Sequence, residues 1–230
     1  WNIDKEMIEL KDAECWIFDL DNTLYSGKSK VFEQVDKKMS VFISNKLNIS
    51  LNEAKKIQKN YFYEYNTTLN GLIKNNAIDP EEFLEFVHDV DISFLKKDLP
   101  LRKELEKMKE LKIIFTNGSK KHALNVIKQL GIEDLFDGIF DIVDSKFIPK
   151  PSIEPYKNLI DKYNINPKLG ILFEDIARNL KPAYDLGMKT VWIENNEAWA
   201  SKDANENFVN FRTKNLSDFL KQVNMLKADQ

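Results

Sequence analysis

Two acidic residues, Asp19 and Asp21, follow the first strongly apolar segment of the chain in the sequence DLDNT. Carboxylates at this spacing can supply a nucleophile and, beside it, a group that gives and takes a proton. The same residue types also end strands in turns that carry no chemistry. Because a buried carboxylate is costly unless it is paired or holds a metal ion, residues elsewhere in the chain have to decide between these two interpretations.

Three later segments carry polar groups of the kinds that hold phosphate or a metal ion. They are the run Thr116, Asn117 and Gly118, the lysine Lys150 before a proline, and the acidic pair Glu174 and Asp175. Taken singly, these segments fit a helix cap, a solvated loop and an acidic turn. Each of them follows a strand-like run, however, so all of them meet Asp19 and Asp21 if the strands share one edge of a parallel sheet.

Five short apolar runs supply those strands, at residues 15–20, 112–116, 138–143, 170–173 and 190–193. Continuous apolar runs are typical of a parallel sheet that helices cover on both faces. Helical patterns follow three of the runs, at residues 119–131, 152–163 and 182–187. We therefore predict an α/β fold with a doubly wound parallel sheet. An edge strand at residues 208–211 and a helix at residues 216–226 complete it.

The stretch after the first strand is different, because residues 25–95 carry helical patterns and no strand-like run. Val35, Phe42 and Leu47 lie on one helical face, and Asp79 with Pro80 begins another helix. An insert at this point lies above the carboxyl ends of the strands, where open α/β sheets bind ligands. We predict a core of residues 1–24 and 96–230 and a helical cap of residues 25–95.

The predicted edge of the sheet gathers four carboxylates, one lysine and one hydroxyl group. Like charges this close together need a cation. Carboxylate oxygens without neighbouring histidine or cysteine favour a hard ion, so we expect Mg²⁺ as the cofactor.

The ordered set DLDNT, TNG, KP and ED resembles the four motifs of the haloacid dehalogenase superfamily of phosphohydrolases, over nearly the whole chain. The resemblance implies a Rossmann-like core with an α-helical cap of the C1 type. FDLDNTLY, YFYEYNTTLNGL and FEDIARNL, at residues 18–25, 61–72 and 173–180, are similar to the pyrimidine 5′-nucleotidase branch. The implied protein is a Mg²⁺-dependent phosphatase whose substrate is a small phosphorylated metabolite, a nucleotide in particular.

The same resemblance implies a role for each site residue. Asp19 is the nucleophile that becomes phosphorylated, and Asp21 is a general acid and then a base. Lys150 neutralises charge on Asp19 and on the phosphoryl group. The phosphoryl oxygens are held by Thr116, Asn117 and Gly118. The metal ligands are Asp19, Asp175 and the backbone carbonyl of Asp21, with Glu174 as a ligand that binds directly or through a water molecule.

Asp21 favours ester hydrolysis over dehalogenation, because a halide leaving group needs no general acid and the dehalogenating relatives lack this second Asp. Three functions stay open. The first is a phosphatase of pyrimidine nucleoside 5′-monophosphates. The second is a phosphatase or phosphomutase of small sugar or carboxylate phosphates, and the third is a non-catalytic binding module on the same fold.

Substrate specificity is expected from the cap. Its polar cluster of Asn66, Thr67 and Thr68 is the candidate for hydrogen bonds that discriminate between ligands. The aromatic run at residues 61–65 fits either stacking on a nucleobase or packing within the cap. His88 and His122 lack partners at metal-ligand spacing, so we expect both at the surface or at helix ends.

Composition narrows the class of protein. The chain has 230 residues, 43% hydrophobic and 31% charged, with a net charge of −3, which predicts a globular protein and no binding of nucleic-acid polymers. No run approaches the roughly 20 apolar residues of a membrane span. Residues 1–11 lack the apolar core of a signal peptide, and a start at Trp1 predicts a preceding residue or two. Cys15, expected in a buried strand, is the single cysteine, so we expect a cytoplasmic protein without disulfides. The sequence leaves the oligomeric state open.

Overall fold

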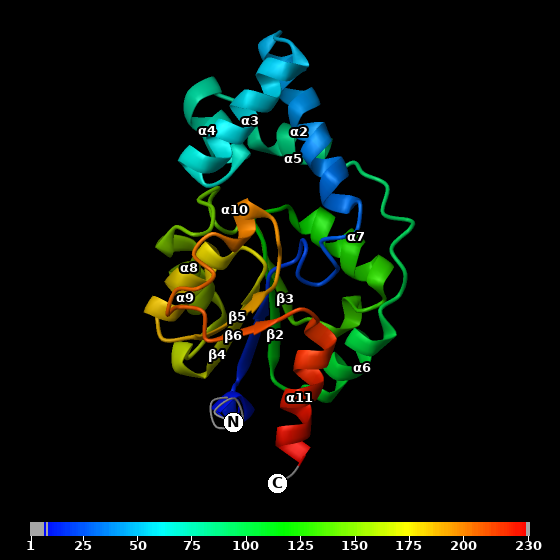
Figure 1. The fold of residues 1–230 in the computed structure, drawn as a ribbon, viewed down its shortest axis with the longest axis vertical. Helices are drawn as coiled ribbons and strands as arrows, with labels where there is room; N and C mark the ends of the chain where they lie inside the picture. The colour runs from blue at the N-terminus through cyan, green and yellow to red at the C-terminus, as the bar shows by residue number, and fades with distance from the viewer. Residues whose placement is uncertain (1–6, 8, 229–230) are drawn as a thin grey trace.

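The computed structural model describes residue 7 and residues 9–228 of the chain. Its centre is a parallel sheet of six strands in the order β3-β2-β1-β4-β5-β6 (Figure 1). The strands are β1 (Cys15–Phe18), β2 (Leu111–Phe115), β3 (Gly138–Phe140), β4 (Gly170–Glu174), β5 (Lys189–Ile193) and β6 (Phe211–Thr213). The strand order reverses between β1 and β4, as in Rossmann-like folds. The predicted fold class is therefore confirmed.

The five predicted strands all form, with ends that differ from the expected ones by up to three residues. The edge strand was misplaced, because β6 begins at Phe211 and residues 208–210 lie outside it. Phe208 is buried, and its carbonyl accepts a hydrogen bond from Thr190 Oγ1 at 2.5 Å. This part of the chain therefore packs against the core before the strand begins.

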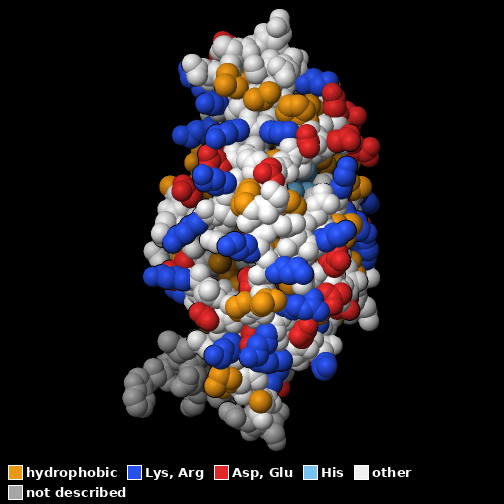
Figure 2. All heavy atoms as spheres, turned by 90° about the vertical axis from the view of Figure 1, so that its right-hand side faces the viewer, with side chains coloured by type: hydrophobic (Ala, Val, Ile, Leu, Met, Phe, Trp, Pro, Cys, Tyr) orange, Lys and Arg blue, Asp and Glu red, His pale blue; other side chains and the backbone are white. Residues whose placement is uncertain are grey.

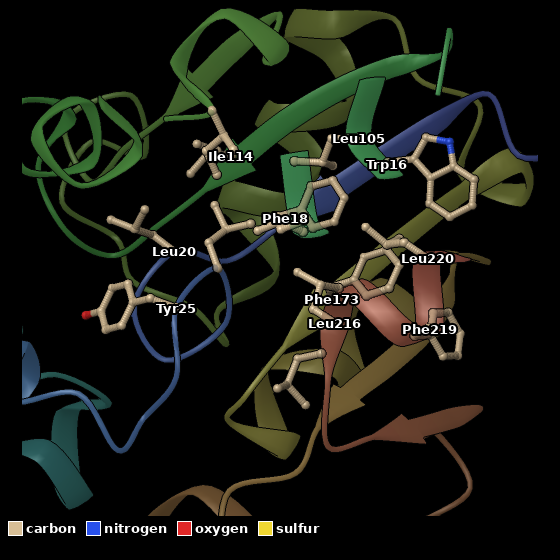
Figure 3. Packing of buried hydrophobic residues seen from close by; sticks show 14 of the residues in the cluster. Trp16, Phe18, Leu20, Tyr25, Leu105, Ile114, Phe173, Leu216, Phe219 and Leu220 are labelled. Carbon is tan, nitrogen blue, oxygen red and sulfur yellow. The ribbon is translucent and has the colours of Figure 1, made fainter. Parts of the chain in front are cut away.

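Alternate residues of β1 face the two sides of the sheet, and each side has its own apolar core. Trp16 and Phe18 lie in the cluster that α6, α7 and α11 cover (Figure 3). In that cluster the Phe173 ring of β4 stacks on Phe18 with 4.8 Å between ring centroids. Cys15 and Ile17 lie in the opposite cluster, with α8 and α9. Burial on both faces explains why β1 has no polar residue.

The helices outside the insert precede, connect or follow these strands. They are α6 (Leu99–Lys107), α7 (Lys120–Leu130), α8 (Ile153–Tyr163), α9 (Lys181–Asp185), α10 (Ala198–Ser201) and α11 (Leu216–Ala228), with 3-10 turns η1 (Glu9–Asp12), η2 (Glu133–Leu135), η3 (Pro167–Leu169) and η4 (Ala177–Leu180). The sequence predicted α7, α8, α9 and α11. Ser119 caps α7 as expected, accepting a hydrogen bond from the His122 N–H, and Gly131 ends it with a φ of 74°.

Of the helices between β1 and β2, the four that precede α6 lie above the carboxyl ends of the strands (Figure 1). They are α2 (Val31–Leu47), α3 (Leu51–Tyr65), α4 (Thr68–Asn76) and α5 (Pro80–Val87), which we call the cap. They share a separate apolar cluster that includes Val35, Phe42, Leu72 and Phe83. A helical insert stands where the sequence predicted one, and the domain boundaries at residues 24/25 and 95/96 stay a prediction.

Charged side chains of both signs are mixed on the surface. On the face shown in Figure 2, Lys and Arg lie between Asp and Glu rather than in one basic area. Among residues 9–228, no helix combines the length and the apolar character that crossing a membrane requires. A cytoplasmic location stays a prediction.

Candidate active site

The predicted site residues meet at the carboxyl edge of the sheet. Asp19 and Asp21 follow β1, Thr116 follows β2, and Glu174 ends β4. Lys150 comes from the loop between β3 and α8 and reaches the same edge. The arrangement follows from the topology, because β1 lies between β2 and β4 in the sheet and parallel strands end on the same side.

Three carboxylates are buried side by side at this edge. Oxygens of Asp19, Glu174 and Asp175 lie within 4.8 Å of one another, and the three residues are 7%, 1% and 2% exposed. The Lys150 ammonium donates hydrogen bonds to Asp19 Oδ1 at 2.9 Å, to Glu174 Oε1 at 2.8 Å and to the Phe115 carbonyl at 2.8 Å. Lys150 is itself buried, so these ion pairs are shielded from water and removal of one partner is costly.

The charges of this cluster do not balance. Three carboxylates meet one ammonium, which leaves an excess of two negative charges. Burial and the Glu174 carboxylate raise the pKa of Asp19 to about 7 despite the opposing charge of Lys150. Burial and Glu174 also raise the pKa of Asp175 well above its usual range. A divalent cation cancels such an excess, and carboxylate oxygens suit Mg²⁺. The residues present therefore fit a magnesium site.

The loop after β2 is fastened by its own side chains. Thr116 Oγ1 accepts a hydrogen bond from the Gly118 N–H at 2.9 Å. Asn117 Oδ1 accepts one from the Lys150 N–H at 2.9 Å, which ties the loop to the segment that carries the lysine. A Cβ atom on Gly118 would lie 3.3 Å from Thr116 Oγ1 and 3.4 Å from the His88 ring. The contacts of this loop with a phosphoryl group stay a prediction.

Asp21 lies beside the cluster and receives two hydrogen bonds on one oxygen. Its Oδ1 accepts from the Tyr25 hydroxyl at 2.5 Å and lies 2.8 Å from His122 Nε2. Burial alone would raise the pKa of Asp21, but the neighbouring His122 and Tyr25 lower it to about 2. Among the described residues, Oδ2 has no hydrogen-bond donor within reach, so this oxygen is free to face a ligand.

A cavity of about 520 Å³ separates the cap from the edge of the sheet. From the sheet side, the lining consists of the charged cluster (Asp19, Lys150, Glu174 and Asp175), Asp21, the loop after β2 and Arg178. The cap contributes residues of α2, α3, α4 and α5, among them Phe32, Lys55, Phe62 and the cluster Asn66, Thr67 and Thr68. A ligand in this cavity therefore touches the acidic cluster and the cap together.

Comparison with known proteins agrees with this geometry. Residues 14–187 match the family model of haloacid dehalogenase-like hydrolases. The chain belongs to this family. Phosphate metabolism protein 8 of Saccharomyces cerevisiae is 32% identical over 191 residues, which are 75% of this chain and 59% of that protein. Glyceraldehyde 3-phosphate phosphatase of Methanocaldococcus jannaschii is 26% identical over 229 residues, 93% of this chain and 98% of that protein.

Solved structures share the fold of this haloacid dehalogenase-like hydrolase. A phosphatase of the family from Thermococcus onnurineus superposes with a TM-score of 0.61 at 20% identity, over 91% of this chain and 97% of that one. A putative β-phosphoglucomutase from Thermotoga maritima superposes with a TM-score of 0.59 at 19% identity, over 92% of this chain and 99% of that one. The expected superfamily is confirmed, and with it an enzyme of the hydrolase class. The pyrimidine 5′-nucleotidase branch stays a prediction.

Both histidines of this hydrolase stand at helix ends, one of the two positions predicted for them, but His122 is not at the surface. His122, in α7, is 2% exposed and contacts Asp21, so a surface position was wrong. His88 does stand at the end of α5, but its ring stacks on His122 with 4.2 Å between centroids, and its Nδ1 lies 2.9 Å from Ser119 Oγ. His122 and Asp21 are 101 positions apart and meet only through the sheet, so sequence spacing gave no signal.

Two asparagines that the sequence analysis did not select orient the buried carboxylates. Asn179 Nδ2 donates to Glu174 Oε1 at 2.8 Å, and Asn195 Nδ2 donates to Asp175 Oδ2 at 2.9 Å. Asn195 follows β5, so the rule that found the other strand-end residues also applies to it.

The specificity candidates in the cap line the cavity but also have structural contacts. Thr67 caps α4 by accepting a hydrogen bond from the Asn70 N–H at 3.1 Å, and Thr68 Oγ1 donates to the Gln58 carbonyl at 3.2 Å. Asn66 ends α3 in the left-handed conformation, with a φ of 70°. The contacts of these three residues with a substrate stay a prediction.

Proposed function

We propose that this chain is a Mg²⁺-dependent phosphatase that hydrolyses phosphate monoesters through a phosphorylated Asp19. The observation that carries the proposal is the buried Lys150 ammonium, bonded to both Asp19 and Glu174 beside Asp175. This cluster supplies a nucleophile, a fixed positive charge and oxygen ligands for a divalent cation within one cavity. The name of the archaeal relative, a phosphatase, supports ester hydrolysis.

In the first step an oxygen of the Asp19 carboxylate attacks phosphorus, and the bond between phosphorus and the ester oxygen breaks. Asp21 gives a proton to the departing oxygen, so the leaving group departs as a neutral alcohol. Lys150 orients Asp19 and offsets the negative charge between the reactants. Magnesium, held by Asp19, the carbonyl of Asp21, Glu174 and Asp175, supplies charge neutralisation at the phosphoryl oxygens when it is bound.

In the second step water attacks the phosphorus of the aspartyl-phosphate and gives a proton to Asp21. The bond between phosphorus and the Asp19 oxygen breaks, so inorganic phosphate leaves and the Asp19 carboxylate is restored. Asp21 is ionised before substrate arrives, because its pKa is about 2. The negative charge of an incoming phosphate group raises that pKa, which favours uptake of the proton that the first step uses.

For the substrate we propose a pyrimidine nucleoside 5′-monophosphate. The cavity of about 520 Å³ lies within the range usual for small-molecule sites. Aromatic rings of Phe32, Phe62 and Trp199 line it, and such rings stack on nucleobases. The similar stretches at residues 61–72 and 173–180 support the same substrate.

A smaller sugar or carboxylate phosphate is the second candidate. It is supported by the archaeal relative, which is named for glyceraldehyde 3-phosphate and aligns with 93% of this chain. Both candidates use the same charged cluster and differ only in how the cap side of the cavity is filled.

Phosphate release tests the proposal. We expect the wild-type protein to hydrolyse p-nitrophenyl phosphate with Mg²⁺ and not with EDTA, and Asp19→Asn to be slower by about 10³-fold or more. Asp185→Asn, in an exposed ion pair with Lys181, is the matched control and should keep full activity. A wild-type rate no faster than that of Asp19→Asn would refute the enzyme and favour the binding module.

A substrate panel then separates the candidates. UMP and CMP should be hydrolysed with a higher kcat/KM than ribose 5-phosphate or glyceraldehyde 3-phosphate. No preference for the nucleotides would refute the substrate and leave the phosphatase standing. Transfer of phosphate between positions of a hexose phosphate, without release to water, would identify a mutase.

A further inference from the structure

Arg178 stands at the edge of the cavity with its charged end toward the cap. It lies in η4, three residues after Asp175, and lines the cavity with the acidic cluster. Its guanidinium lies 4.9 Å from the centre of the Phe62 ring, which comes from α3 of the cap. It therefore belongs to the part of the cavity where the core faces the cap.

Arg178 differs from the other two arginines of the chain in having no polar partner. Arg102 donates to both carboxylate oxygens of Asp134 at 2.7 and 2.8 Å, and Arg212 donates to the Ala204 carbonyl at 2.9 Å. Arg178 forms no hydrogen bond or close ion pair with any residue in the described part of the chain, and its Nε is buried without a partner. Burial lowers its pKa, while Glu174 and Asp203 attract it only at longer range.

An arginine in this state is costly for the fold. A buried N–H group without an acceptor loses its hydration and gains nothing in exchange. The contact with Phe62 offsets part of that cost, but it supplies no acceptor for the buried Nε–H. A ligand in the cavity can supply the missing acceptors.

Phe62, the ring beside Arg178, belongs to a group of three aromatic side chains. Trp199 stacks on Phe32 with 5.9 Å between centroids and an interplanar angle of 27°, and it meets Phe62 edge-on at 5.9 Å. We call Phe32, Phe62 and Trp199 the aromatic wall. Two of its rings come from the cap and one from α10 of the core, and all three line the cavity. The aromatic wall can stack on a planar group, and the N–H groups of the Arg178 guanidinium can donate to an oxygen at the edge of that group.

We infer that Arg178 and the aromatic wall form a subsite for a planar, carbonyl-bearing group on the alcohol side of the phosphate ester. The inference rests on the proposed phosphatase and adds a specificity-determining residue to it. Uracil and cytosine both present a ring carbonyl to such a subsite, whereas adenine has none and ribose 5-phosphate has no ring base at all.

The test compares esters that share the phosphate and differ in the group beyond it. Arg178→Gln should lower kcat/KM for UMP by about 10- to 100-fold, the loss expected for a hydrogen bond to a charged group. Hydrolysis of ribose 5-phosphate should change by less than about threefold, because the variant keeps every group that handles the phosphate. The preference for UMP over AMP should shrink by the same factor. Arg178→Lys should lose nearly as much as Arg178→Gln, because a point charge cannot replace the fork of N–H groups on the guanidinium.

Thermal unfolding of Arg178→Met separates a specificity role from a structural one. Met keeps apolar contact with Phe62 and removes the unpartnered charge, so this variant should be as stable as the wild type or more stable.

Arg212→Gln, which loses a hydrogen bond outside the cavity, is the control that should keep the UMP preference. If Arg178→Gln lost the same factor in kcat/KM for UMP and for ribose 5-phosphate, the inference would be overturned, because Arg178 would then act on the phosphate group that both esters share. Full UMP activity of Arg178→Lys, or a marked loss of stability in Arg178→Met, would overturn it as well. A wild type that hydrolyses neither ester would refute the proposed function itself.

Discussion

Replacement of Lys150 by Met tests whether the buried cluster depends on one cation. The wild-type ammonium makes three hydrogen bonds of 2.8–2.9 Å to Asp19, Glu174 and Phe115. Breaking a buried ion pair by removing one partner costs roughly 3–5 kcal/mol, because the other charge stays buried without compensation. For a chain of this length, 1 kcal/mol shifts the midpoint of thermal unfolding by roughly 2–4 °C. We therefore expect Lys150→Met to unfold roughly 6–20 °C below the wild type without metal.

Lys162→Met is the matched control. The Lys162 ammonium pairs with Asp144 at 2.7 Å and lies over the Phe140 ring at 5.5 Å, much as Lys150 lies over Phe115 at 4.8 Å. Its side chain is 46% exposed, so solvent screens the pair and the loss should stay below about 1 kcal/mol.

Thermal unfolding followed by circular dichroism, with EDTA and near pH 8, measures both variants. The loss in Lys150→Met should be smaller near pH 5, because Asp19, whose pKa is raised by burial and by the Glu174 carboxylate, can then take up a proton and its repulsion from Glu174 is lost. Adding Glu174→Gln to Lys150→Met should restore part of the stability, since it removes one unpaired carboxylate. A loss in Lys150→Met no larger than that in Lys162→Met would refute the view that this ammonium balances buried charge.

Three further predictions follow from other contacts. Burial raises the pKa of the Cys15 thiol to about 12, so a thiol reagent should label Cys15 only in denaturant. Absorbance of the reagent measures the labelling, and rapid labelling of the native protein would contradict this. His122→Asn removes one of the two hydrogen-bond partners that hold the Asp21 carboxylate in place. Because Asp21 is then less well oriented toward the leaving oxygen, kcat/KM should fall about tenfold or more for an alkyl phosphate and little for p-nitrophenyl phosphate, whose leaving group needs no proton; equal losses would be inconsistent with Asp21 as the acid. Burial and Glu174 raise the pKa of Asp19 from 3.8 to about 7, so the folded state holds a proton that the unfolded state releases in this interval. The stability of the metal-free protein should therefore fall as pH rises from about 4 to about 7 and be recovered with Mg²⁺; thermal unfolding with a midpoint that rises over this interval would exclude that linkage.

The sheet was predictable because its strands are covered on both faces. Runs such as residues 170–173 are apolar throughout, as is typical of strands in a parallel sheet that is covered on both faces. β6 was misplaced because Phe211, Arg212 and Thr213 form no apolar run. Its position is set by pairing with β5, which the local sequence does not encode. α4 was missed because it begins only three residues after α3 ends. The polar residues between the two helices gave no separate signal for the start of a new helix.

The charged cluster was predictable for a topological reason. Asp19 and Glu174 are far apart in the sequence, but they stand at the ends of parallel strands, which share one edge of the sheet. Lys150 lies in the loop that leaves the same edge after β3. His122 obeys no such rule, because it stands in the first turn of a helix and reaches Asp21 through a side-chain contact. Arg178 was visible only as part of a family-like stretch, and its lack of a partner is a property of three-dimensional packing.

Trp199 is a fluorescent residue at the contact between the core and the cap. Its indole lies against two rings of the cap, Phe32 and Phe62, whereas Trp16 and Trp192 are buried in the core. Any motion that lifts the cap from the core has to separate Trp199 from these rings and bring water to the indole. In a Trp1→Phe background, the emission maximum therefore reports how far the two parts stand apart, and time-resolved emission can follow the entry of substrate and the departure of product without an added dye.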